Sequence, residues 1–253
     1  MGVLVEKLRR ICENTSEPLG FRMVREKPTL RMLLIAVLAK SDVGLSGEVA
    51  RSGVDAVLAR GHEFEKKELA LGQLAEAVGQ TPWGLWLDVG TLPFVERLSK
   101  EGADFVVCEA SVAPVGLLQD DGLGKILKLE LPRDETVACA VSDLDVDAVL
   151  LEARRERGVL TVLELLSCQW LSGSVGKPLL VSIQDDVTDV EVQALWDAGV
   201  RGLIVEAKER DSQESLARLR GLIESLPARP KRADKSRAIL PSLGYVESDY
   251  EDE

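Results

Sequence analysis

Residues 53–60 read Gly-Val-Asp-Ala-Val-Leu-Ala-Arg, and the same pattern recurs three more times along the chain. Each copy begins at a turn, continues through a small and a polar residue into an apolar run, and ends on a charged side chain. The other copies are residues 102–109, 145–152 and 199–206. Short apolar runs bounded in this way are typical of buried parallel strands.

Four more apolar runs lie between these copies, so strand and helix alternate eight times. This alternation predicts an α/β protein with a single (β/α)8 barrel. We expect its strands over residues 32–39, 54–60, 83–89, 103–109, 125–131, 146–152, 178–184 and 200–207.

The segments around the barrel differ in character. Residues 1–30 form a lead-in that contains a short amphipathic helix over residues 3–13, which either plugs the barrel floor or packs on its flank. The barrel itself is expected over residues 31–227, with an unusually short helix near residues 114–119. Residues 228–253 form a charged tail, basic and then acidic, whose end is expected to be disordered.

Composition limits the class of protein. A length of 253 residues suits one barrel, and a net charge of −12 argues against binding to nucleic acid. No apolar run approaches membrane-spanning length and no signal-peptide core is evident, so we expect a cytoplasmic protein with no membrane partner. The cysteines are scattered and predict neither a zinc site nor a disulfide framework: Cys12, Cys108, Cys139 and Cys168.

The alternation of side chains along each strand predicts which residues face the barrel interior. In the third strand Gly84, Trp86 and Asp88 share one face, and the other face is wholly apolar. The same register in all strands predicts a polar ring at the C-terminal mouth, with Lys128 one layer deeper: Lys40, Arg60, Asp88, Glu109, Glu130, Glu152, Gln184 and Glu206. By contrast, Asp55, Asp104 and Asp147 begin their strands, and we assign them structural turn roles.

Five carboxylates at one mouth repel one another unless a cation lies among them. One interpretation is a divalent metal site, Mg²⁺ or Mn²⁺, held by Asp88, Glu109 and Glu130. A second is an ion-pair network with Lys128 and Arg60, and a third is that the carboxylates face solvent. The placement of the three metal candidates at the ends of successive strands resembles the enolase superfamily, but the capping domain of that family is missing and its chemistry is not carried over.

Three residues are candidates for catalysis. Lys128 either forms a Schiff base with a carbonyl substrate or neutralises neighbouring glutamates. Glu152 is a candidate base. His62, the only histidine, follows the second strand and is either an acid or base or a solvated loop residue. The remaining ring residues are assigned to substrate binding: Lys40, Arg60, Gln184 and Glu206.

Residues 54–58 and 194–205 resemble the repeats of ribulose-phosphate-binding and related metabolic TIM barrels. That resemblance implies a glycine-rich phosphate site after strands seven and eight, whereas here residues 184–187 and 206–209 are acidic and lack glycine. The leading hypothesis is therefore a lyase or isomerase that acts on a small polar metabolite. The alternative is a non-catalytic barrel with a structural, binding or regulatory role. No nucleotide cofactor is expected, and a homo-oligomer is compatible with either hypothesis.

Overall fold

The computed structural model describes residues 2–13, 30–38, 43–61, 70–87, 95–129, 135–152, 159–207 and 212–227. Parallel strands pair in sequence order, and β1 also pairs with β8, which closes an eight-stranded barrel. The predicted fold is confirmed. The strands are β1 (Leu33–Leu38), β2 (Ala56–Arg60), β3 (Trp83–Trp86), β4 (Phe105–Glu109), β5 (Gly124–Leu129), β6 (Ala148–Glu152), β7 (Leu179–Ile183) and β8 (Val200–Ala207).

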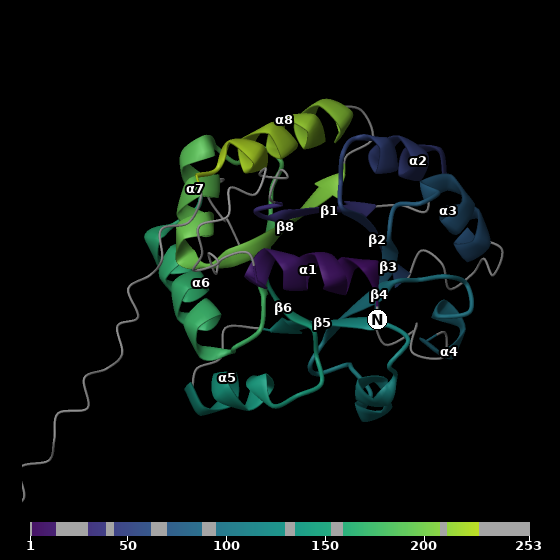
Figure 1. Ribbon diagram of the computed structural model, residues 1–253, viewed down its shortest axis with the longest axis horizontal. Helices are drawn as coiled ribbons and strands as arrows, with labels where there is room; N and C mark the ends of the chain where they lie inside the picture. Colours follow the sequence, from purple (N-terminus) through teal and green to yellow (C-terminus); the bar gives the residue numbers. More distant parts are fainter. Residues whose placement is uncertain are drawn as a thin grey trace, which may run out of the picture.

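Helices α2 to α8 surround the barrel, and α1 crosses one end of it (Figure 1). The helices are α1 (Val3–Glu13), α2 (Val43–Arg51), α3 (Ala70–Val78), α4 (Val95–Leu98), α5 (Glu135–Ser142), α6 (Val162–Ser174), α7 (Asp189–Ala198) and α8 (Ser212–Ser225). The short helix expected after the fourth strand is a single 3₁₀ segment, η3 (Val115–Gln119). A capping box formed by Thr188 and Glu191 begins α7. None of the helices in the described ranges is long and apolar enough to cross a membrane.

Apolar side chains cover both faces of the barrel sheet, as the strand alternation predicts. Leu85 and Leu87 belong to the layer between sheet and helices, whereas Phe105 and Val107 belong to the cluster inside the barrel. Glycine lets the inner cluster close, because a Cβ on Gly84 would lie 2.5 Å from the carbonyl oxygen of Phe105. Only a residue without a side chain fits beside this buried ring.

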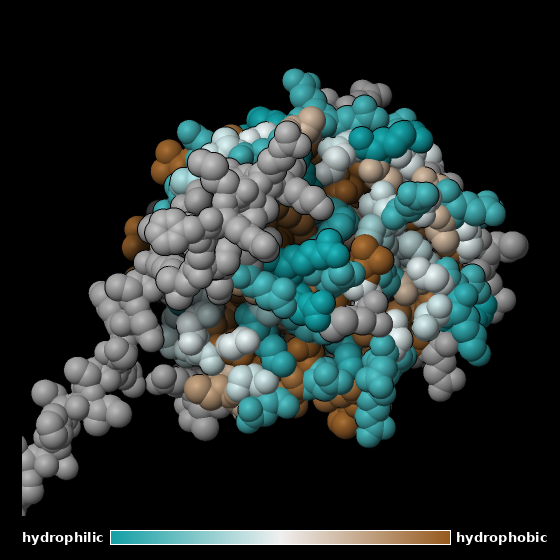
Figure 2. All heavy atoms as spheres, in the orientation of Figure 1, coloured by the Kyte–Doolittle hydropathy of each residue, from teal (hydrophilic) through white to brown (hydrophobic). Residues whose placement is uncertain are grey.

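Helix α1 plugs the barrel floor, which settles the alternative that the sequence left open. Its apolar stripe of Leu4, Leu8 and Ile11 is buried in the inner cluster. Figure 1 looks onto this floor with α1 across the centre, and Figure 2 shows hydrophilic side chains over the outer side of the helix. The plug therefore seals one end of the barrel, and the mouth lies at the other end.

The three aspartates at the strand starts are structural, but they bind neighbouring segments and not their own turns. Asp104 accepts hydrogen bonds from the backbone N–H groups of Val3 and Leu4, at 2.6 and 2.8 Å. These two groups belong to the first turn of α1, where helix N–H groups have no partner within the helix. Asp147 accepts a hydrogen bond from the N–H of Lys125 at 2.8 Å.

Asp55 joins three parts of the chain. Its carboxylate accepts a hydrogen bond from the N–H of Leu34 in β1 at 3.0 Å, and lies 2.6 Å from Nη2 of Arg220 in α8 and 3.4 Å from Nζ of Lys7 in α1. The Asp55 side chain is only 10% exposed. A buried carboxylate must be compensated by such partners, so Asp55 ties the plug and the last helix to the first two strands of the barrel.

Candidate functional site

The C-terminal ends of the strands form the barrel mouth, which is the face that carries active sites in barrel enzymes. The strand register places Glu109 of β4 beside Lys128 of β5, and Arg60 of β2 beside Trp86 of β3. Glu152 ends β6 on the far side of β5. Among the predicted site residues, Lys40, His62, Asp88 and Glu130 lie outside the described residues, so their placement stays a prediction.

Lys128 is held between two carboxylates. Its Nζ lies 2.8 Å from Oε1 of Glu109 and 2.8 Å from Oε2 of Glu152. The lysine side chain is 16% exposed, whereas the glutamate side chains are 44% and 51% exposed. One shielded ammonium therefore forms ion pairs with two carboxylates that remain open to the mouth. The three side chains together have a net charge of −1.

Trp86 connects this group to a second cation. The Cζ atom of Arg60 and Nζ of Lys128 each lie 5.4 Å from the centroid of the Trp86 ring, within the range of cation–π attraction. Trp86 also packs on the inner apolar cluster. The strand alternation placed Trp86 on the inward face but assigned it no role. The available signal was a tryptophan two residues before a predicted mouth position, in a chain with only 4% aromatic residues.

Gln184 and Glu206 are exposed on the same side of the barrel. Gln184 follows β7 directly, and Glu206 is the penultimate residue of β8, next to Val37 of β1 in the strand register. The ion pairs of Lys128 with Glu109 and Glu152 do not include either residue. Both therefore stay candidates for contact with a bound molecule.

Lys128 is protonated near neutral pH. Burial lowers the pKa of this amine, but the hydrogen bonds to Glu109 and Glu152, together with their negative charge, more than offset burial and raise the pKa above its ordinary value. A protonated amine is not a nucleophile. The geometry therefore favours the ion-pair interpretation of Lys128.

This arrangement predicts a specific pH dependence of stability. Because the folded-state pKa of Lys128 lies above the ordinary value of 10.5, the ion pairs contribute fully below that value and are lost as the pH rises through the folded-state pKa. The melting temperatures of the wild type and Lys128→Met should differ by a constant amount from about pH 7 to about pH 10, and the difference should shrink at higher pH. A difference that changes near neutral pH would contradict this and indicate a lowered pKa.

One of the three predicted metal ligands, Glu109, lies among the described residues. Among the described residues, no three His, Cys, Asp or Glu side chains lie close enough to hold a metal ion. Two of the three predicted ligands are outside those residues. At the third, Glu109, Oε1 accepts a hydrogen bond from Lys128, so a metal ion would compete with that ammonium or bind through Oε2.

No protein-family model matches the sequence. No curated protein is significantly similar to it. Solved structures do match the fold. Thiamine phosphate pyrophosphorylase from Pyrococcus furiosus is 15% identical, with a TM-score of 0.58 over 77% of this chain and 96% of that one.

Two further structures give the same result. Orotidine 5'-phosphate decarboxylase from Pyrococcus horikoshii is 12% identical, with a TM-score of 0.58 over 77% of this chain and 100% of that one. A mutant tryptophan synthase α-subunit from Pyrococcus furiosus is 12% identical, with a TM-score of 0.58 over 77% and 97%. The chain has the TIM-barrel fold. At these identities the likeness concerns architecture alone.

Proposed function

We propose that the mouth around Lys128 is the active site of a lyase or isomerase that abstracts a proton from a small polar metabolite. The observation that carries this proposal is the contact of one shielded ammonium with two open carboxylates, Glu109 and Glu152, at 2.8 Å each. Carboxylates in this position are suited to move protons, and a fixed ammonium is suited to stabilise an oxyanion.

The proposed step uses three side chains. Glu152 accepts the proton from the carbon next to a carbonyl group, as the C–H bond breaks and an enolate forms. The Lys128 ammonium donates a hydrogen bond to the enolate oxygen, and so acts as a cation and not as a Schiff-base nucleophile. Arg60, which lies over Trp86 on the opposite side of β3 from Glu109, binds a carboxylate of the substrate.

A keto acid is the substrate class that fits this mouth. Two of the similar structures are named for phosphate esters. In this chain, however, Asp185 and Asp186 follow β7, and Glu206 lies near the end of β8, where a phosphate would meet negative charge. A carboxylate bound by Arg60 avoids that repulsion. The proposal includes a divalent ion at Asp88, Glu109 and Glu130. Such an ion would act as a Lewis acid and, like Lys128, would stabilise the negative charge of the enolate.

Deuterium exchange tests this proposal whatever the final product of the reaction is. The wild type, incubated in D₂O with a panel of small keto acids, should exchange the hydrogen next to the carbonyl of at least one of them, as followed by NMR. Glu152→Gln should slow this exchange about 100-fold, because the amide cannot accept the proton. Glu224→Gln, a matched change at an exposed position of α8, should leave it unchanged.

Two outcomes would overturn the proposal. If no keto acid exchanges, with or without added Mg²⁺ or Mn²⁺, the barrel does not perform this chemistry. If Glu152→Gln changes only the melting temperature, the ion pairs are a structural network in a non-catalytic barrel. An exchange that requires the metal would support the metal-dependent form of the proposal.

A further inference from the structure

The floor of the barrel contains a cavity beside the plug. Helix α1 is tied to β2 through Lys7 and Asp55, and to the start of β4 through Asp104. On its other side, facing the starts of β6, β7 and β8, it leaves a cavity of about 520 Å³ that is open to solvent. We call this the floor cavity; it is lined by Val5, Leu8, Arg9, Cys12, Val146, Asp147, Ser172, Gly176, Lys177, Pro178, Leu179, Gly199 and Arg201. Its volume is in the range of small-molecule sites.

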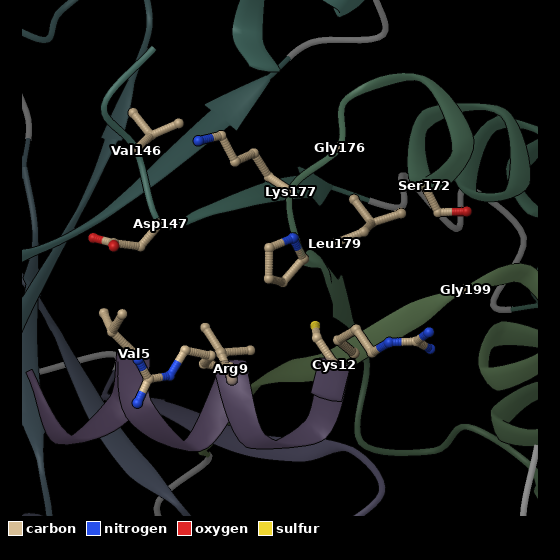
Figure 3. A pocket seen from close by; sticks show the side chains of 13 residues that line it. Val5, Arg9, Cys12, Val146, Asp147, Ser172, Gly176, Lys177, Leu179 and Gly199 are labelled. Atoms are coloured by element: carbon tan, nitrogen blue, oxygen red, sulfur yellow. The ribbon is translucent and has the colours of Figure 1, made fainter. Parts of the chain in front are cut away.

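Three cations and one carboxylate line the floor cavity of this strongly acidic protein. Among the described residues, the cations Arg9, Lys177 and Arg201 line it with the carboxylate of Asp147. That carboxylate already accepts a hydrogen bond from the N–H of Lys125. Outside the lining, Glu13 lies 3.6 Å from Nε of Arg9, and Asp145 is close enough for the charge of Lys177 to lower its pKa. The chain as a whole has a net charge of −12. Figure 3 shows Arg9 and Cys12 rising from α1 on one side of the cavity, with Lys177 and Asp147 on the other side.

Arg201 departs from the repeat that builds the barrel. The first three copies of the pattern have aspartate at their third position, and the fourth has Arg201 there. The aspartates accept hydrogen bonds from backbone N–H groups near the strand starts. Arg201, by contrast, lines the floor cavity with a cation. Its guanidinium lies 5.1 Å from the centroid of the Trp196 ring, which restricts its orientation.

The other residues that line the floor cavity indicate what kind of body an anionic ligand would have. Val5, Leu8 and Leu179 are buried apolar residues. Pro178 adds a ring at the start of β7. An occupant therefore has an anionic group for the cations and an apolar body for these walls.

We propose that the floor cavity binds a small organic anion, a molecule that carries carboxylate or phosphate groups on a short apolar body. The site is at the opposite end of the barrel from the mouth, and the inference does not depend on the function proposed there. A ligand in the floor cavity contacts α1, β7 and β8 together, so it fastens the plug to the last strands of the barrel.

Thermal melting of the full chain tests this site, with inorganic phosphate and succinate as separate probes and chloride to match ionic strength. A probe that binds should raise the melting temperature by about 5 °C or more at a hundredfold excess over its Kd. Lys177→Gln and Arg201→Gln should each remove most of this rise. Arg10→Gln, on the same helix but outside the lining, should keep it.

Cys12 gives a second readout that binding at the mouth would not move. Burial raises the pKa of its thiol above the ordinary value; the charge of Arg201 and a hydrogen bond from it lower that pKa in part, and the charge of Glu13 raises it. In a Cys139→Ser background, which removes the exposed cysteine, iodoacetamide at mildly alkaline pH should alkylate Cys12 more slowly when a probe is bound. Lys177→Gln should abolish this protection.

The probes separate the two sources of anionic charge. Protection by phosphate alone would assign a phosphate ester, and protection by succinate alone would assign a carboxylic acid. If neither probe slows alkylation of Cys12, or if Lys177→Gln melts and reacts like the wild type with both probes, the floor cavity is not an anion site.

Discussion

Lys128→Met should slow the deuterium exchange of the keto-acid substrate by about 1000-fold, the largest loss expected from any single change at the mouth. The substitution removes the ammonium that stabilises the enolate. It also leaves the carboxylates of Glu109 and Glu152 facing each other without the cation that now lies 2.8 Å from each, so that they repel a negatively charged substrate. The measurement is the NMR exchange rate at saturating substrate.

Two control variants separate this effect from a loss of structure. Lys100→Met makes the same change at an exposed position and should exchange at the wild-type rate. Lys128→Arg keeps the positive charge and should retain part of the activity. Circular dichroism should show that Lys128→Met is folded, because its two partners are about half exposed and regain water. A folded Lys128→Met protein that exchanges at the wild-type rate would refute the role of this lysine.

Asp55→Ala should destabilise the protein by about 3 kcal/mol, which for a chain of this size corresponds to a fall of about 6–12 °C in melting temperature. The aspartate is shielded from water, and its removal leaves Arg220, Lys7 and the N–H of Leu34 without their common acceptor. Differential scanning calorimetry or thermal circular dichroism measures the fall.

Asp147→Ala is the matched control for this prediction, since it changes the same position of another copy of the repeat. Asp147 accepts a backbone hydrogen bond from Lys125, and we expect a loss of about 1 kcal/mol. Equal losses in the two variants would show that the ion pairs of Asp55 with α1 and α8 add nothing to stability. Asp55→Asn, which keeps an acceptor for Leu34 but loses the charge, should fall between them.

The repeated strand pattern was sufficient to predict the barrel and the direction of its side chains. Alternation in residues 83–89 correctly placed Trp86 on the inner face and Leu85 and Leu87 on the outer face, because a strand has only two faces. Several strands begin one or two residues later than predicted. Val54, for example, was expected in a strand that begins at Ala56, because Val54 is as apolar as the residues of the strand.

Contacts between strands could not be predicted in the same way. The register that sets Glu109 beside Lys128, and Arg60 beside Trp86, depends on the stagger of neighbouring strands, and no single strand contains that information. The amphipathic stripe of α1 likewise indicated a buried face but not the surface that buries it. The floor cavity was missed for this reason, although the exchange of aspartate for Arg201 in the fourth copy was a visible signal.

The position of α1 in the barrel floor has a consequence for the order of events during folding. Helix α1 is synthesised before the barrel strands, yet the apolar cluster that receives it includes Ile204 of β8, the last strand of the barrel. At about 5–20 residues per second, β8 is made about 10–40 seconds after Leu4, Leu8 and Ile11. The complete apolar surface that buries α1 therefore exists only after β8 has been made, so we expect full docking of this helix to be a late step of folding.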